Sequence, residues 1–199
     1  PRKWPGLRME TYMSNTTNRR TFFTWMTSAF AALTAGRAAA AIETPSAMEG
    51  PYYPDPSMRF EDVDNDLVRI AGQVKDAGGE IITLSGRVLD EAGGPRVGYR
   101  VEIWQCDVNG RYIHPRDRNT APQDMAFQGF GHDITGGGGE YRFRTIKPVS
   151  YPGRTPHIHV KIFDAAGQEV LTTQFYLSGH PENQSDRLFR AMSEAEAHA

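Results

Sequence analysis

The sequence predicts a mainly β protein, an antiparallel β-sandwich with long loops and a helix near its C-terminus. Three observations support this fold class. Short runs of alternating apolar and polar residues recur from residue 80 onward, turn signals separate them about every ten residues, and helix formers gather in the last segment. The chain has 199 residues, 39% of them hydrophobic, which suits one globular domain preceded by a tail.

Five segments have the period-two alternation of half-buried strands: residues 80–90, 100–105, 141–146, 157–163 and 170–177. An Asn-Gly hairpin signal at 109–110 leads into a further short candidate at 111–113. A polar, glycine-rich loop is expected over 114–139. The C-terminal helix is expected over 185–197, where a serine can cap a run of helix formers.

Paired arginines, Arg19 and Arg20, stand directly before an uncharged run, residues 21–36, that is followed by small residues. This order is typical of an export signal, and the arginine pair resembles the twin-arginine signal. The run is too short to span a bilayer comfortably. We therefore expect residues 1–41 to be an export signal with upstream residues, and residues 42–199 to be the exported domain, periplasmic or extracellular, without stable membrane insertion. An amphipathic helix retained in the mature protein is the alternative.

The charge pattern argues against a nucleic-acid partner, since the formal net charge is -2 and lysines and arginines do not cluster. The single cysteine, Cys106, cannot form an internal disulfide. It lies at the end of a predicted strand, so we expect a buried apolar thiol and not a reactive one.

Two histidines one residue apart, His157 and His159, lie on the predicted strand over 157–163. Alternate side chains of a strand point to opposite faces, so if Ile158 and Val160 face the core, both imidazoles point away from it on the same side. Two imidazoles on one face of a rigid strand can share a metal ion. This pair is therefore the first candidate for a functional site.

Two tyrosines are candidates to join the histidines. Tyr151 precedes His157 across a turn that contains two prolines, and Tyr112 follows the hairpin signal. Phenolate and imidazole donors suit a hard, oxidised iron, because anionic oxygen stabilises the ferric state. A zinc site with a carboxylate such as Asp133 is the competing metal hypothesis, and exposed strand histidines without a ligand role are the simpler alternative.

Several motifs occur in order along the chain: Glu-Gly-Pro-Tyr-Tyr at 49–53, Val-Glu-Ile-Trp-Gln-Cys-Asp-Val-Asn-Gly-Arg-Tyr at 101–112, Tyr-Arg-Phe-Arg-Thr-Ile-Lys-Pro at 141–148, Tyr-Pro-Gly-Arg-Thr-Pro-His-Ile-His at 151–159 and Thr-Gln-Phe-Tyr at 173–176. By these motifs the chain resembles the intradiol ring-cleaving catechol dioxygenases, nearest to the protocatechuate 3,4-dioxygenase branch. The resemblance covers about residues 49–178. It implies a prealbumin-like sandwich that binds non-haem Fe(III) and uses O2 to cleave a catecholic aromatic to a muconate-type dicarboxylic acid.

The same resemblance assigns Tyr112, Tyr151, His157 and His159 to Fe(III), Arg154 and Gln174 together with Tyr151 to catalysis, and Trp104 to the wall of the substrate pocket. Tyr52 is a further candidate, for substrate binding at the pocket mouth. Tyr151 would be the phenolate that leaves the iron, and Arg154 would stabilise the negative charge that accumulates on the ring.

A non-catalytic binding module is the main alternative, because residues 86–104 also resemble transthyretin-like segments of carrier and adhesion domains. A zinc hydrolase is a third hypothesis. Gly153 stands where the protocatechuate enzymes carry a tryptophan, so we expect a more open pocket. The chain ends at Ala199 within its predicted helix, so we expect a truncated C-terminus that lacks the closing strand. The identity of the catechol stays open, as does assembly into a homo-oligomer.

Overall fold

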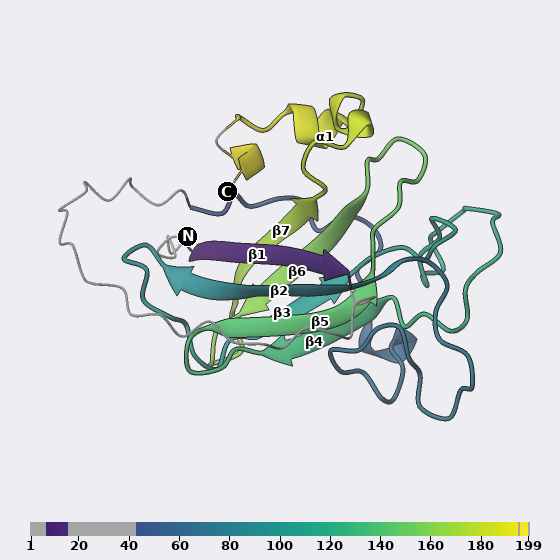
Figure 1. The fold of residues 1–199 in the computed structure, drawn as a ribbon, viewed down its shortest axis with the longest axis horizontal. Helices are drawn as coiled ribbons and strands as arrows, with labels where there is room; N and C mark the ends of the chain where they lie inside the picture. Colours follow the sequence, from purple (N-terminus) through teal and green to yellow (C-terminus); the bar gives the residue numbers. More distant parts are fainter. Residues whose placement is uncertain (1–6, 16–42, 195, 199) are drawn as a thin grey trace, which may run out of the picture.

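Two antiparallel sheets form the body of the protein (Figure 1), a computed structural model that describes residues 7–15, 43–194 and 196–198. One sheet has the strand order β1-β2-β5, with β1 at Leu7–Asn15, β2 at Ile81–Asp90 and β5 at Glu140–Ile146. The other has the order β4-β3-β6-β7, with β3 at Arg100–Trp104, β4 at Phe130–Ile134, β6 at His157–Phe163 and β7 at Glu169–Tyr176. The predicted mainly β fold with antiparallel sheets is confirmed.

The two sheets pack against each other through one hydrophobic core. Ile158, Val160 and Ile162 of β6 are fully buried in it, in the same cluster as inward-facing residues of β2. Burying each such side chain contributes about 1.5–3 kcal/mol relative to an exposed position. Because β6 places these alternate residues in the core, His157 and His159 lie on the opposite face of the sheet, as the alternation predicts.

The strand register lines up one row of side chains across the outer face of the four-stranded sheet. Trp104 of β3 lies opposite Phe130 of β4 on one side and opposite His159 of β6 on the other. His159 in turn lies opposite Gln174 of β7. A second, smaller apolar cluster forms around this row, made of Trp104, Cys106, Tyr112 and Phe130. Burial there raises the pKa of the Cys106 thiol to about 12, in agreement with the expected inert thiol.

The loop predicted over 114–139 contains the strand β4, so this assignment is wrong in part. The sequence of β4, Phe-Gly-His-Asp-Ile, has little apolar alternation. Gly131 is required in it, because a Cβ there would lie 2.5 Å from Leu67 Cδ1. The candidate strand at 111–113 is instead part of a loop, which Asp117 holds by accepting a backbone N–H at 2.7 Å.

The C-terminal helix predicted over 185–197 is wrong in extent. The structure has three short pieces there: the 3-10 helix η2 at Pro181–Gln184, the α-helix α1 at Arg187–Arg190 and the 3-10 helix η3 at Glu196–His198. Asp186, and not Ser185, caps α1. Beyond α1, Ser193 donates its hydroxyl and its backbone N–H to Glu196, which competes with helical hydrogen bonds. These pieces lie beyond the end of β7 (Figure 1).

The N-terminal boundary also differs from the prediction. The export-signal hypothesis places residues 7–15 outside the domain, but they form β1, which pairs with β2 along its whole length. Leu7 and Met9 of β1 belong to the hydrophobic core, so this strand is part of the packed sandwich. The rest of the predicted signal, residues 1–6 and 16–41, lies outside the described residues.

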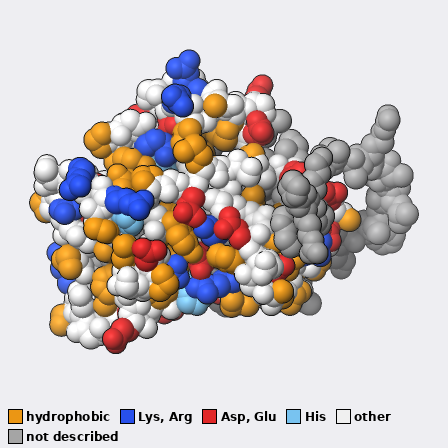
Figure 2. Space-filling view, turned by 180° about the vertical axis from the view of Figure 1, so that it is seen from behind, with side chains coloured by type: hydrophobic (Ala, Val, Ile, Leu, Met, Phe, Trp, Pro, Cys, Tyr) orange, Lys and Arg blue, Asp and Glu red, His pale blue; other side chains and the backbone are white. Residues whose placement is uncertain are grey.

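The back of the molecule carries basic and acidic side chains interspersed with hydrophobic ones (Figure 2). This mixture agrees with the formal net charge of -2. The helices in the described part of the chain are short, and none has the length and apolar character that a membrane span needs. One of them, the 3-10 helix η1 at Pro56–Met58, lies in the long segment that precedes β2.

Candidate metal centre

His157 and His159 of β6 bring two ring nitrogens together on the outer face of the sheet. Their side chains are buried, with 1% and 2% of their surface exposed, and their Nε2 atoms are 3.2 Å apart. His157 Nδ1 donates to the backbone carbonyl of Thr155 at 2.7 Å, which leaves its Nε2 lone pair directed toward His159. Two nitrogens at this separation can both reach one metal ion at about 2.1 Å.

Tyr112 and Tyr151 lie against the two imidazoles from separate loops. The Tyr151 ring centroid is 5.5 Å from that of His157, and the Tyr112 ring centroid is 6.2 Å from that of His159. The two phenol rings are 5.6 Å apart. The loops meet at Gly110, which has a φ of 73° and whose absent Cβ would lie 3.4 Å from Tyr151 Cβ. The structure therefore brings the four predicted iron ligands together.

Three buried polar atoms around these rings have no hydrogen-bond partner within the described chain: Tyr112 Oη, His159 Nδ1 and Trp104 Nε1. Leaving a buried polar atom unpaired costs about 1–3 kcal/mol. A cation bound to the Tyr112 oxygen would offset that cost and would use the Nε2 lone pairs of the two histidines. The donor set therefore fits a metal ion, and its phenol oxygens favour a hard one.

The local electrostatics keep both imidazoles neutral and, without a cation, both phenols protonated. Burial, with Arg154 nearby, lowers the pKa of His157 to about 4. Burial, with His157 and Arg154 beside it, lowers the pKa of His159 well below its ordinary range. Burial raises the pKa of Tyr112 well above its ordinary range, and it raises the pKa of Tyr151 although Arg154 opposes the rise. Neutral imidazoles are ready ligands, and a bound cation would release the phenol protons.

Arg154 and Gln174 lie beside these rings and contact each other. Arg154 follows Tyr151 in a tight turn, where its backbone N–H donates to Tyr151 O at 2.9 Å. Its Nη2 donates to Gln174 Oε1 at 2.5 Å and to Tyr176 Oη at 3.3 Å. Gln174 is fixed in turn, because its Nε2 donates to Met48 O at 2.9 Å. The predicted catalytic pair is thus assembled at one side of the candidate centre.

Trp104 and Tyr52, the predicted substrate-binding residues, back the site in different ways. Trp104 is 1% exposed and stacks on His159, with ring centroids 4.8 Å apart and an angle of 10° between the ring planes, so it packs against one face of the imidazole. Tyr52 is partly exposed and stacks on Tyr112 at 4.6 Å, with planes 28° apart. Tyr52 therefore lies nearer the surface, where it can limit the opening of the site.

Tyr176 and Asp186 contact Arg154, and sequence reasoning missed both. Tyr176 Oη donates to Gln174 Oε1 at 2.9 Å, which closes a triangle with the guanidinium. Asp186 accepts from Arg154 Nε at 2.8 Å across a separation of 32 positions in the chain. No local sequence pattern links residues so far apart, although the Gln174-Phe-Tyr176 motif did contain Tyr176.

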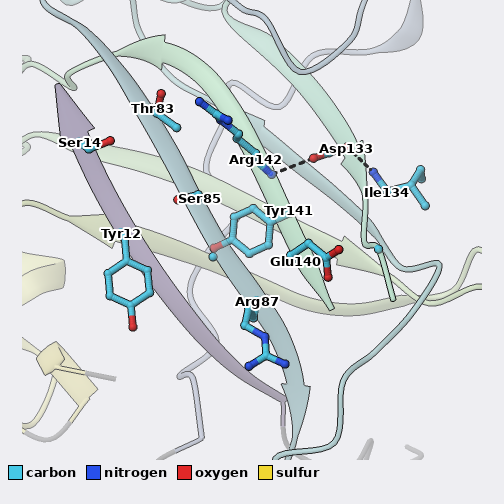
Figure 3. A pocket seen from close by; sticks show the side chains of 12 residues that line it. Tyr12, Ser14, Thr83, Ser85, Arg87, Asp133, Ile134, Glu140, Tyr141 and Arg142 are labelled. Carbon is cyan, nitrogen blue, oxygen red and sulfur yellow. Dashed lines mark hydrogen bonds between the residues drawn. The ribbon is translucent and has the colours of Figure 1, made fainter. Parts of the chain in front are cut away.

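The carboxylate of the zinc hypothesis, Asp133, lies elsewhere. It lines an open hollow of about 670 Å³ over the three-stranded sheet, together with side chains such as Thr83 and Tyr141. Figure 3 shows the Asp133 carboxylate engaged by the backbone N–H groups of Arg142, at 2.8 Å, and Ile134, at 2.9 Å. Among the residues that the structure describes, no three His, Cys, Asp or Glu side chains form a group that could hold a metal ion. The oxygen donors beside the two histidines are therefore phenols.

Comparisons with known proteins find dioxygenases among the similar sequences. Residues 48–196 match the family model Dioxygenase_C, described as dioxygenase. The chain is 41% identical, over 140 residues, to the protocatechuate 3,4-dioxygenase beta chain of Burkholderia cepacia. The matched segment covers 67% of this chain and 60% of that relative. It is 32% identical, over 168 residues, to the catechol 1,2-dioxygenase of Pseudomonas sp. (strain EST1001). The matched segment covers 73% of this chain and 51% of that relative. The chain thus spans half to three fifths of the length of these curated relatives.

Solved structures give the same result. The dioxygenase domain of a dioxygenase and carbohydrate-binding protein fusion from Streptomyces sp. SirexAA-E is similar with a TM-score of 0.55 and 38% identity, over 73% of this chain and 82% of that one. The intradiol ring-cleavage dioxygenase from Tetranychus urticae is similar with a TM-score of 0.55 and 26% identity, over 73% of this chain and 78% of that one.

Proposed function

This chain belongs to the dioxygenase family, among its intradiol ring-cleaving members, and from this premise we propose that it is a non-haem Fe(III) intradiol dioxygenase. Its substrates would be a catecholic aromatic and O2. The carbon–carbon bond between the two hydroxylated carbons breaks, each of these carbons gains one oxygen atom from O2, and the product is a muconate-type dicarboxylic acid. The relative at 41% identity makes protocatechuate the first substrate to test.

The observation that carries the proposal is the convergence of two imidazoles and two phenols in one buried place. His157 and His159 present Nε2 atoms 3.2 Å apart, and the Tyr112 oxygen beside them is buried without a partner in the described residues. A binding module without a metal would gain nothing from burying these polar atoms together. When bound, Fe(III) supplies a Lewis acid that takes both oxygens of a deprotonated catechol and makes its ring reactive toward O2.

The chain's own residues support three further requirements of the reaction. With its proton released by a bound cation, Tyr151, the more exposed of the two phenols, would be a phenolate that can accept a proton from a substrate hydroxyl at its Oη. The Arg154 guanidinium stabilises negative charge that develops on the ring, a preorganised electrostatic effect. Gln174 fixes that guanidinium through its Oε1. Trp104 and Tyr52 limit water at the imidazole and phenol against which they stack.

Visible spectroscopy and oxygen uptake of the full chain after loading with Fe(III) test the proposal. We expect a broad phenolate-to-iron charge-transfer band and consumption of one O2 per catechol cleaved, with catechol, protocatechuate and hydroxyquinol as test substrates. Tyr112→Phe and Tyr151→Phe should each weaken or remove the band. Tyr12→Phe, at a tyrosine 66% exposed on β1, should leave it unchanged. A colourless protein that contains iron would reject the ligand set, and a coloured one without oxygen uptake would reject the activity.

We also propose that the paired arginines and the uncharged run that follows them, residues 19–36, direct export by the twin-arginine route, which their order supports. Replacing Arg19 and Arg20 together by lysine keeps the charge and removes the arginine pair. Cell fractionation should then find the variant retained in the cytoplasm and the wild-type chain exported. Equal distribution of the two would reject this route.

A further inference from the structure

Asp186 is a buried carboxylate that joins the C-terminal segment to the turn before the two histidines. Its side chain has 0% of its surface exposed. Oδ2 accepts from Arg154 Nε at 2.8 Å and from the backbone N–H of Thr155 at 3.0 Å. Oδ1 accepts from the backbone N–H groups of Leu188 at 2.8 Å and Phe189 at 3.2 Å, at the start of α1. One carboxylate thus receives four donors, two on each oxygen.

We propose that Asp186 is a positioning residue of the candidate metal centre, because its Oδ2 fixes both the guanidinium of Arg154 and the backbone N–H of Thr155, the residue whose carbonyl orients His157. The inference rests on the proposed function, since it assigns how that reaction's charged side chain and one of its metal ligands are held. Asp186 acts through these residues and does not itself reach the reacting atoms.

The effect on Arg154 follows from which of its nitrogens are already used. Nε donates to Asp186, and Nη2 donates to Gln174 and Tyr176. Nη1 makes no hydrogen bond to any described residue, so it is the nitrogen left to meet an oxygen of a bound catechol. A planar guanidinium anchored at two of its three nitrogens is fixed in orientation as well as in position. Asp186 thereby decides where Nη1 points.

The effect on His157 passes through Thr155. The N–H of Thr155 donates to Asp186 and its carbonyl accepts from His157 Nδ1 at 2.7 Å, so the carboxylate and the imidazole sit on either side of one residue. The Thr155 hydroxyl donates to Asn183 Oδ1 at 2.7 Å, which anchors the same residue a second time. Groups that orient a metal-ligating histidine in this way typically change metal affinity or activity by about 10–100-fold when they are removed.

Asp186 also balances a charge that is largely buried. Arg154 has 16% of its side chain exposed and Asp186 has none, so removing the carboxylate leaves the guanidinium without its counter-ion. An asparagine cannot replace it. It offers one acceptor oxygen, and its amide would then face either Arg154 and Thr155 or the backbone of α1, all of which are donors.

Asp186→Ser separates positioning from helix capping. A serine caps a helix about as well as an aspartate, but its shorter side chain cannot also reach Arg154 and Thr155. We expect kcat to fall by about 10–100-fold with KM changed by less than about threefold. In an Arg154→Ala background the same change should lower kcat by a smaller factor than in the wild-type background, because only the path through Thr155 to His157 is then left to lose. Asp164→Ser, at a turn carboxylate between β6 and β7 that accepts backbone N–H groups, is the matched control and should leave kcat unchanged.

Hydrogen exchange of the Thr155 amide in the metal-free chain gives a readout that needs no activity. Asp186→Ser should accelerate this exchange, and Asp164→Ser should not. Equal losses of kcat in the wild-type and Arg154→Ala backgrounds would overturn the role that acts through Arg154, and unchanged exchange at Thr155 would overturn the role that acts through His157. If the wild-type chain cleaves no catechol, the proposed function fails. The exchange rate of the Thr155 amide still tests whether Asp186 holds Thr155, the residue whose carbonyl orients His157.

Discussion

Acidifying the metal-free protein should destabilise it, because buried neutral imidazoles must then become charged. Folding lowers the pKa of His157 from 6.5 to about 4. Between these two values the unfolded chain binds a proton that the folded protein does not, so the free energy of unfolding falls as the pH falls through this window. Above about pH 6.5 neither state binds the proton, and this contribution no longer depends on pH.

The expected size of the effect follows from the same change. One pKa unit corresponds to about 1.4 kcal/mol, so a fall from 6.5 to about 4 gives about 3 kcal/mol in full and about 2.5 kcal/mol at about pH 4.5. His159 adds to the loss, because its pKa is lowered as well. Asp186 acts in a lower window. Burial opposes its charge, but hydrogen bonds from Arg154 and Thr155 outweigh burial and lower its pKa below 3.8, so its contribution is lost only at more acidic pH.

Urea unfolding of the chelator-treated full chain at several pH values between about 7.5 and 4.5 measures this dependence. The variant His157→Gln removes one of the two buried titrating groups, so its stability should fall less steeply over the same range. A wild-type profile that is flat over this range would show that the imidazoles are not held neutral by burial. The wild-type and His157→Gln profiles coinciding would assign the dependence to other groups.

Three further changes have outcomes that the structure determines. Tyr112→Phe should leave the metal-free protein as stable as the wild type, or up to about 1 kcal/mol more stable by urea unfolding, because the lost hydroxyl is buried without a partner in the described chain. Calorimetry of the same variant should nevertheless show at least about tenfold weaker binding of Ga³⁺, a redox-inert substitute for Fe(III). Phe143→Ala, at a core residue with 0% exposure, should cost about 3–5 kcal/mol in the same unfolding assay. Gly131→Ala should destabilise the protein by more than about 1 kcal/mol, because the new Cβ would lie 2.5 Å from Leu67 Cδ1 and 2.6 Å from the backbone oxygen of Asp64. Leu67→Ala should not rescue it, since that change keeps the backbone contact and truncates a fully buried leucine.

The elements predicted best from the sequence are strands in which apolar and polar residues alternate regularly. The strand predicted over 157–163 is observed at His157–Phe163 without a shift, because Ile158, Val160 and Ile162 leave no other face for the core. The four predicted iron ligands also meet, since their motifs occur together in one family and their loops converge on the outer face of one sheet. The strand β4 was missed because a glycine that accommodates Leu67 interrupts its pattern.

Elements set by contacts between distant residues were predicted least well. The helix expected over 185–197 ends after one turn, because side chains of Ser193 and Glu196 bond to each other and to local backbone. Asp186 gave no signal of its link to Arg154, because an aspartate before a helix is an ordinary capping residue. The pairing of β1 with β2 was likewise invisible, since the residues of β1 precede a segment that has the pattern of an export signal.

The candidate centre and the hydrophobic core are coupled through the register of β6. Because side chains alternate with a period of two, moving this strand by one residue against β3 would bring His157 and His159 into the core and turn Ile158 outward. That exchange would lose burial worth several kcal/mol and leave two imidazoles in an apolar core. The packing of the core therefore holds the imidazoles beside the phenols, and the sandwich fixes this half of the donor set before any metal binds.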